Sequence, residues 1–206
     1  ARMLRLPTDG KPISIIDVSG VPSDITTTVV AVLSRLVFDY ASWAREERTR
    51  PILLVCEEAH RYVPSEKHFD ASAVGKVLSR IAKEGRKYGV ALGLVTQRPS
   101  DLAEGVLSQC GTIISMRLNN ERDQAFVRAA MPEGARGFLD SIPALRNREC
   151  IICGEGAAVP MRVTFDTLEE AKRPASEDPS FSALWRETGG EEEALQRIVH
   201  RWRTHS

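Results

Sequence analysis

The sequence predicts an α/β fold, with a mostly parallel β-sheet flanked by helices and an antiparallel hairpin at one edge. Two apolar runs, 52–56 (ILLVC) and 90–95 (VALGLV), have the length and composition of buried strands. Between them, residues 71–88 place apolar side chains at helical spacing, which predicts a crossover helix. Near the end, 148–153 and 159–165 flank a Gly-Glu-Gly turn and predict the hairpin.

The amino-terminal part adds one strand and one helix to this prediction. The apolar run 13–18 predicts a central strand of the same sheet. Ser23 or Asp24 has the side chain of a helix cap, and a long helix is expected to run from there to about Glu46. The expected buried side of that helix carries Val29, Val30, Val32, Leu33, Leu36 and Val37.

After the second strand the pattern predicts shorter elements. Ser100 is expected to cap a short helix that begins at Asp101, and Asn120 is expected to cap a helix over 121–130. The remaining elements predicted from local pattern are a strand over 111–117 and a helical turn over 139–145.

The composition changes at Thr167, which predicts a domain boundary. Residues 1–166 form the α/β domain, while 167–206 begin with a charged, proline-containing linker. Two helices are expected in the tail, over 181–186 and 192–203. The second has one apolar face, made of Leu195, Ile198, Val199 and Trp202.

Composition restricts the class of protein further. Lys and Arg balance Asp and Glu at 28 each, so no overall basic charge indicates nucleic acid. We find no apolar run near the ~20 residues of a membrane span, so we expect a cytoplasmic protein without a membrane partner. Cys150 and Cys153 are three apart on a predicted strand and face opposite sides. All four cysteines are therefore expected to be reduced thiols.

Two adjacent carboxylates, Glu57 and Glu58, directly follow the first buried strand. Gln97 follows the second strand, after Thr96. Because the carboxyl ends of parallel strands open on one edge, where ligands of open α/β sheets bind, these side chains should converge. In nucleoside-triphosphatases such acids hold Mg²⁺ and polarise the attacking water. The alternative is a strand that exits to solvent with both acids hydrated.

Three motifs extend this argument: EEAHRYVP at 57–64, RIAKEGRKYG at 80–89 and GLVTQRPS at 93–100. In this order and spacing they resemble the HerA/FtsK class of hexameric DNA-translocating ATPases, HerA most closely. The resemblance runs from about Ile13 to about Phe165. It implies a RecA-like P-loop NTPase core in a hexameric ring, which hydrolyses ATP with Mg²⁺ and moves double-stranded DNA. It also implies a possible nuclease partner that resects DNA ends.

The resemblance assigns roles to single residues. Glu57 corresponds to the Walker B acid near Mg²⁺, acting through water, although Asp is commoner at this position. Glu58 corresponds to the catalytic carboxylate that orients water. Gln97 corresponds to the polar sensor of the γ-phosphate, with Thr96 beside it as a nucleotide-binding residue.

The same family places an arginine finger where this sequence has a cationic cluster. Arg86 is the favoured residue for this role and Arg80 the second choice. A finger offsets the negative charge that develops on the transferred phosphoryl group. The alternative is that the cluster, which also holds Lys83 and Lys87, is the solvated face of a helix.

The phosphate-binding loop G-x-x-x-x-G-K-[ST] does not occur in these 206 residues. We therefore expect that this chain alone does not hydrolyse ATP, and that it is a carboxyl-terminal part of a longer ATPase. A non-hydrolysing ring or scaffold subunit with a degenerate ATPase fold is the alternative. A DEAH-box helicase is a weaker one, since Thr96-Gln97-Arg98 stands where that class has Ser-Ala-Thr.

Overall fold

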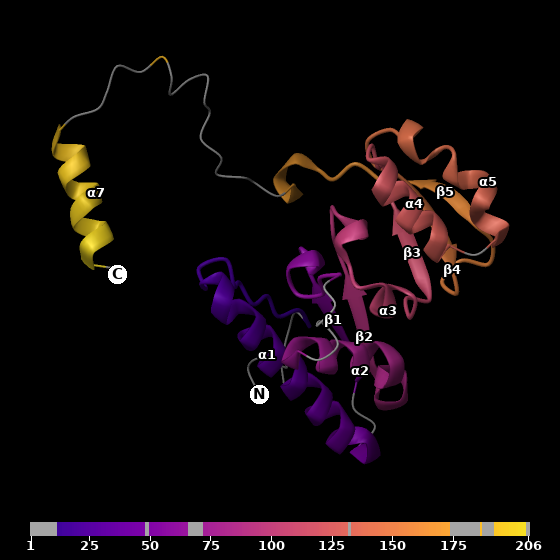
Figure 1. Cartoon of the computed structure of the whole chain (residues 1–206), viewed down its shortest axis with the longest axis horizontal. Helices are drawn as coiled ribbons and strands as arrows, with labels where there is room; N and C mark the ends of the chain where they lie inside the picture. Colours follow the sequence, from indigo (N-terminus) through magenta and orange to yellow (C-terminus); the bar gives the residue numbers. More distant parts are fainter. Residues whose placement is uncertain are drawn as a thin grey trace. The chain divides into compact units, whose positions relative to one another are not determined.

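The computed structural model describes residues 12–47, 50–65, 72–131, 133–173, 186 and 192–204. The chain divides into two compact units, Ala1–Asp166 and Thr167–Ser206 (Figure 1). The first unit contains a parallel pair of strands with its helices and a three-stranded antiparallel sheet.

A parallel pair of strands, joined by a helix, positions the rest of the first unit. β1 (Ile52–Cys56) and β2 (Val90–Leu94) pair in register from Ile52↔Val90 to Cys56↔Leu94. α2 (Ala73–Tyr88) connects them and is capped by the Ser72 side chain, which accepts from the Gly75 N–H. The predicted strand–helix–strand unit is therefore confirmed.

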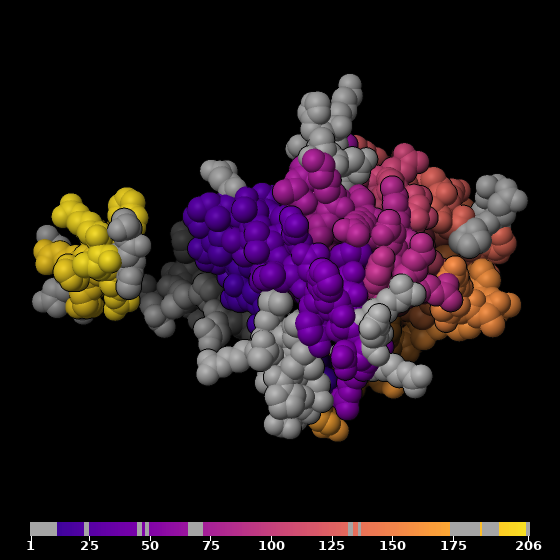
Figure 2. Space-filling view, turned by 90° about the horizontal axis from the view of Figure 1, so that it is seen from below, coloured from indigo at the N-terminus to yellow at the C-terminus, as the bar shows by residue number. Residues whose placement is uncertain are grey.

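Helix α1 (Ser23–Trp43) packs against α2 and is followed by a 3₁₀ turn, η1 (Ala44–Glu47). Phe38 of α1 is buried, and its ring meets the Tyr88 ring edge-on at 5.2 Å between centroids. In Figure 2 the indigo side chains of α1 adjoin the purple and magenta segments of this unit. The main core cluster between α1, α2 and the parallel strands includes Val37, Phe38, Ala41, Val63, Leu78, Ile81, Val90 and Val106.

The predicted capping of α1 is wrong. Pro22 occupies the position before the helix, and no side chain caps it. Proline fixes φ near its helical value and has no N–H that needs a partner, so the helix starts directly after it. Ser23 and Asp24 therefore lie in the first turn rather than ahead of it.

The predicted strand over 13–18 is also wrong, because these residues have no regular structure. Ile13 and Ile15 are 67% and 91% exposed, while Val18 packs against the core. A strand needs a neighbour to pair its N–H and C=O groups. Among the described residues, β1 and β2 pair only with each other, and residues 13–18 do not use the outer edge of either strand.

Helix α1 also bears on the expectation about membranes. By length and composition, its segment Ile25–Trp43 is apolar enough to cross a membrane, although it contains Arg35 and Asp39. The expectation that no such run exists is therefore corrected. Of this segment 33% is buried, including Phe38 in the core, while Ile25, Val32, Leu36 and Trp43 are exposed.

The segment after β2 differs from the prediction at Ser100. Pro99–Asp101 form a 3₁₀ turn, η4, and the helix α3 (Glu104–Leu107) begins only three residues later. Ser100 does not cap a helix, since it is buried within η4 and its N–H donates to Asp123. Proline at the start of η4 favours the turn, because its fixed φ suits the first position of a helical turn.

An antiparallel sheet forms the other part of the first unit (Figure 1). β3 (Thr112–Ser115) pairs with β4 (Glu149–Gly154), which pairs with β5 (Met161–Thr164). The predicted hairpin is confirmed. The α/β class is confirmed as well, although only one strand pair is parallel among the described residues, because β3 joins β4 instead of β2.

Short helices cover the antiparallel sheet. α4 (Glu121–Ala130) is capped as predicted, with the Asn120 Oδ1 atom accepting from the Arg122 N–H at 2.9 Å. The turns η5 (Glu133–Ala135), α5 (Arg136–Leu139) and η6 (Ile142–Ala144) follow. A second core cluster includes Val127, Met131, Leu139, Ile142, Leu145, Ile151 and Cys153. All four cysteines are free thiols; Cys56, Cys150 and Cys153 are buried, whereas Cys110, also expected to be buried, is only partly so.

The second unit contains a 3₁₀ turn, η7 (Glu170–Lys172), and the helix α7 (Glu192–Thr204). The predicted helix over 192–203 is confirmed. Leu195, Ile198 and Trp202 on its apolar face are exposed. The predicted helix over 181–186 lies outside the described residues except for Arg186.

A glycine in α2 sets how closely this helix approaches β2. A Cβ atom at Gly85 would lie 2.3 Å from the Val90 carbonyl oxygen. We expect Gly85→Ala to destabilise the protein by about 1–3 kcal/mol, because backbone must move to admit the methyl group. Chemical denaturation monitored by circular dichroism measures this change.

The matched control is Gly105→Ala in α3, where a Cβ atom would meet nothing within 4 Å. There the substitution should be neutral or slightly stabilising, since alanine has the higher helix propensity. Equal unfolding midpoints for the two variants would contradict the close approach of α2 to β2.

Candidate functional site

The candidate site lies at the carboxyl ends of β1 and β2, where main-chain bonds continue past both strands. The Val95 N–H donates to the Cys56 carbonyl at 3.0 Å, and the Ala59 N–H donates to the Val95 carbonyl at 2.9 Å. These bonds hold the two strand ends in fixed register. As a result, the polar residues that follow each strand lie side by side, as the sequence predicts.

Glu58 has an unusual backbone conformation for a residue with a side chain. Its φ of 49° and ψ of 45° lie in the left-handed region. This conformation costs of order 1 kcal/mol or more for an L-residue other than glycine. It turns the chain sharply from β1 into the 3₁₀ turn η2 (Ala59–Arg61). The strain is retained because the neighbouring main-chain bonds and side-chain contacts determine the turn.

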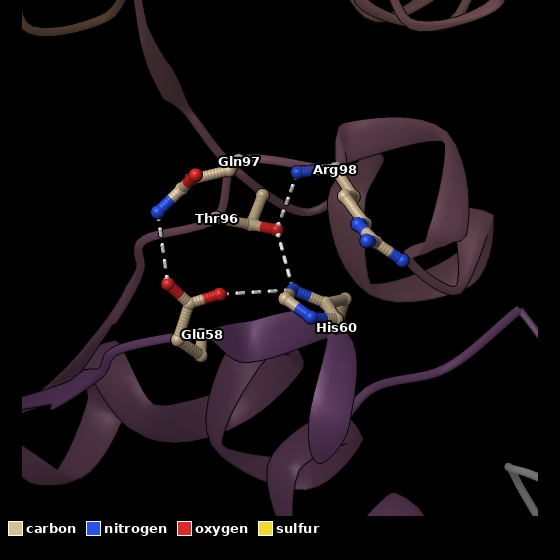
Figure 3. Close-up of polar contacts among 5 residues, drawn as sticks. All are labelled: Glu58, His60, Thr96, Gln97 and Arg98. Carbon is tan, nitrogen blue, oxygen red and sulfur yellow. Dashed lines mark hydrogen bonds and ion pairs between the residues drawn. The ribbon is translucent and has the colours of Figure 1, made fainter. Parts of the chain in front are cut away.

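Both oxygens of the Glu58 carboxylate have polar neighbours (Figure 3). The Gln97 Nε2 atom donates to Oε1 at 3.1 Å, and the His60 Nδ1 atom lies 3.4 Å from Oε2. The predicted convergence of Glu58 and Gln97 is therefore present. The Glu58 side chain is 44% exposed, so solvent and a ligand can still reach it.

Thr96 completes this polar cluster from the β2 side. Its Oγ1 atom accepts from the Arg98 N–H at 3.0 Å and lies 3.1 Å from the His60 Nδ1 atom. Figure 3 shows one nitrogen of the His60 ring in contact with both Glu58 and Thr96. The cluster thus links the turn after β1 to the turn after β2.

The first acid, Glu57, has a different environment, since it is exposed at the end of β1. Its neighbour Cys56 is buried, and burial raises the pKa of this thiol to about 11. The thiol therefore stays neutral at physiological pH and adds no negative charge beside the two acids. Only the carboxylates give the strand end its acidic character.

The donor set suits Mg²⁺ only in part. Among the described residues, no group of three or more His, Cys, Asp or Glu side chains could hold a metal ion. Mg²⁺ is commonly held by one or two carboxylates together with substrate phosphates and water. Exposed Glu57 fits the role of such a single carboxylate, and the remaining ligands would have to come from phosphate and water.

The two loops beyond the strands support each other. The Ala103 N–H donates to the Val63 carbonyl at 2.9 Å, and the Ser65 N–H donates to the Asp101 carbonyl at 2.8 Å. Asp123 of α4 is 7% exposed and accepts from the Ser100 N–H at 3.0 Å. These bonds attach the loop that carries Gln97 to α4 and to the loop after η2.

Arg80, one of the two candidate fingers, points toward α1. Its guanidinium carbon lies 4.5 Å from the centroid of the Phe38 ring, and its Nε atom is 3.6 Å from Glu84. Arg80 also lines an open groove between α1 and α2. The structure thus does not bring Arg80 to the acid pair within one chain.

Arg86, the other candidate, lies in the last turn of α2, next to the start of β1. The Ile52 N–H donates to the carbonyl of Gly89, the residue that caps this helix, at 2.8 Å. Because α2 runs antiparallel to the strands, its carboxyl end lies at the amino ends of β1 and β2, whereas the acids lie at their carboxyl ends. Arg86 is exposed there and cannot meet Glu58 of the same chain.

Two solved structures have a fold similar to that of this chain. The chain is similar to the genome packaging NTPase B204 of Sulfolobus turreted icosahedral virus 2 in complex with AMPPCP. The TM-score is 0.52 at 16% identity, covering 68% of this chain and 63% of that one. A second structure, the DNA-packaging ATPase B204 from Sulfolobus turreted icosahedral virus, gives a TM-score of 0.50 at 17% identity, covering 64% and 60%. The fold is that of the P-loop NTPases.

Sequence comparison narrows this class. The chain is 40% identical over 125 residues to the DNA double-strand break repair helicase HerA of Pyrococcus furiosus, covering 61% of this chain and 22% of that protein. It is 28% identical over 194 residues to HerA of Sulfolobus acidocaldarius, covering 92% and 38%. A probable helicase of Methanocaldococcus jannaschii is 33% identical over 177 residues, covering 84% and 34%.

These similarities agree with the resemblance indicated by the motifs: the chain is similar to one segment of the HerA helicases. No family model matches it. The chain spans between 22% and 38% of the length of these relatives.

Two contributors to the site were not predicted as site residues. His60 is part of the EEAH motif, but its motif position alone does not reveal the contact with Thr96, 36 residues away. Asp123 reads as an ordinary first-turn acid of α4. The buried N–H of Ser100 that it accepts follows from tertiary structure, so no local pattern indicates it.

We expect Asp123→Ala to destabilise the first unit by about 1–3 kcal/mol, since a buried N–H would lose its acceptor. Asp123→Asn keeps an acceptor oxygen and should cost less. Urea denaturation of the unaltered protein and the two variants measures their relative free energies of unfolding. Equal stability of the alanine and asparagine variants would contradict the role of this bond.

Proposed function

We propose that this chain is the carboxyl-terminal part of a HerA-type, ATP-driven double-stranded DNA translocase. The observation that carries the proposal is the bonded pair Glu58 and Gln97 at the shared carboxyl edge of β1 and β2. The HerA helicases to which the chain is similar act in DNA double-strand break repair according to their names. The role that we propose is therefore the processing of DNA ends in the cytoplasm.

The residues at this edge have distinct tasks in the proposed reaction. ATP with Mg²⁺ supplies the phosphoryl group that is transferred to water. Glu57 would hold the metal ion, through a water molecule. Glu58 would orient the attacking water, since a carboxylate has about four lone-pair sites and two neighbours occupy only part of them. Gln97 and Thr96 would contact the γ-phosphate.

The arginine would come from another subunit. Arg86 lies near the amino ends of the strands, and the acids lie at the carboxyl ends. Arg86 would therefore reach a nucleotide only across an interface between two copies. A closed ring, which we propose to be a hexamer, presents such an interface to every subunit. Double-stranded DNA would pass through the ring, and a nuclease would be the partner that degrades the exposed end.

Phosphate binding requires residues that this sequence does not contain. Without G-x-x-x-x-G-K-[ST] the chain has no backbone cradle for the phosphates, so we propose that it is inactive by itself. The same observation favours the second candidate, a non-hydrolysing ring or scaffold subunit with a degenerate ATPase fold. The full-length gene product distinguishes the two.

Glu58→Gln in the full-length gene product should lower duplex-stimulated ATP hydrolysis by about 10²- to 10⁴-fold, the range for loss of a general base. Phosphate release measured with and without duplex DNA tests this. Loss of turnover while nucleotide binding persists would support the translocase. Absence of turnover in the unaltered full-length protein would instead favour the scaffold subunit.

Arg86→Ala should lower kcat by about 10³-fold or more while nucleotide affinity changes much less, as expected for an arginine finger. Lys83→Ala, which removes an exposed cation from the same helix, is the matched control. Mixing Arg86→Ala subunits with Glu58→Gln subunits should restore part of the activity, because some interfaces would combine an intact acid with an intact arginine. Failure of the mixture to regain turnover would argue against a finger from the neighbouring subunit.

A further inference from the structure

We propose that His60 is a positioning residue, which fixes the Glu58 carboxylate and the Thr96 hydroxyl group through its Nδ1 atom. This inference rests on the proposed function, in which Glu58 orients water and Thr96 contacts phosphate. The Nδ1 atom lies 3.4 Å from Glu58 Oε2 and 3.1 Å from Thr96 Oγ1. The His60 side chain is 20% exposed, so its neighbours restrict the ring.

The carboxylate determines where the imidazole proton sits. A lone pair on Nδ1 would face the negative Oε2 atom of Glu58 and repel it. A hydrogen on Nδ1 can instead be shared between Oε2 and the Thr96 Oγ1 atom (Figure 3). We therefore assign His60 the tautomer with the proton on Nδ1, with Nε2 left as an acceptor.

This assignment sets the role of Thr96. A hydroxyl group has two acceptor lone pairs and one O–H donor. The Arg98 N–H occupies one lone pair, and the His60 Nδ1–H occupies the other. The O–H of Thr96 is then available to donate outward, which suits a phosphate oxygen and not a cation. His60 thereby makes Thr96 a donor at the site.

His60 also stabilises the geometry of Glu58. Gln97 holds only Oε1, so loss of His60 would leave Oε2 without the contact described here. The backbone of Glu58 is in the strained left-handed conformation, and side-chain contacts help to retain it. Without them the carboxylate would sample other positions, and fewer molecules would have it aimed at the attacking water.

Nuclear magnetic resonance tests the tautomer without any catalysis. In the ¹⁵N-histidine-labelled 206-residue chain at pH 8, long-range ¹H–¹⁵N spectra should show His60 protonated on Nδ1. His60→Gln identifies its signals among the four histidines. Glu58→Gln should move the proton toward Nε2, whereas the control Glu57→Gln should not. A His60 protonated on Nε2 in the unaltered chain, or an unchanged tautomer in Glu58→Gln, would overturn the proposal.

The kinetics of ATP hydrolysis by the full-length gene product give a second test of the proposal. His60→Ala should lower kcat about 10- to 100-fold, the loss expected for a hydrogen bond to a charged group, with little change in KM for ATP. His60→Asn places an amide N–H near the position of Nδ1 and should recover most of kcat. His60→Gln reaches the position of Nε2 instead and should not.

A structural role alone would lower stability in all three variants and leave asparagine no better than glutamine. Equal kcat for His60→Asn and His60→Gln would therefore overturn the proposal. Absence of turnover in the unaltered full-length protein would refute the proposed function. The tautomer measurement would still decide whether His60 holds Glu58 and Thr96.

Discussion

The parallel pairing of β1 with β2, continued by main-chain bonds beyond both strands, is the constraint on which the site depends. The bonds from Val95 to Cys56 and from Ala59 to Val95 leave no freedom to slide one strand end past the other. A shift of one residue would turn each side chain to the opposite face of the sheet. Gln97 could then no longer reach Glu58. The register of the two strands thus determines which polar side chains lie next to each other.

Helix α2 is also held in a fixed position against the two strands, at their amino ends. Its cap accepts the first N–H of β1, and Gly85 allows its backbone to lie directly on β2. The helix runs along the strands from their carboxyl ends to their amino ends. It therefore keeps Arg86 apart from Glu57 and Glu58 of the same chain.

Local patterns were sufficient where an element depends on its own residues. The strands β1 and β2, the crossover helix and the Asn120 cap follow from spacing and capping chemistry, and all are present. The convergence of Glu58 and Gln97 was predictable as well, because parallel topology alone brings strand ends together.

Predictions failed at the start of α1, where the adjacent Pro22 decides the structure, and at positions where a distant partner does. Residues 13–18 have the composition of a strand, but no described strand pairs with them. Ser100 resembles a helix cap, yet Asp123, 23 residues away, takes its N–H instead. His60 was not assigned to the site from the sequence for the same reason, since its partner Thr96 lies 36 residues further along the chain.

The left-handed backbone of Glu58 has a consequence for protein engineering. Glycine adopts this conformation without strain, so a screen that rewards thermal stability alone would favour glycine at position 58. Such a screen would also remove the carboxylate that contacts Gln97 and His60. Relief of backbone strain at position 58 and retention of these two contacts are therefore opposing demands on the sequence.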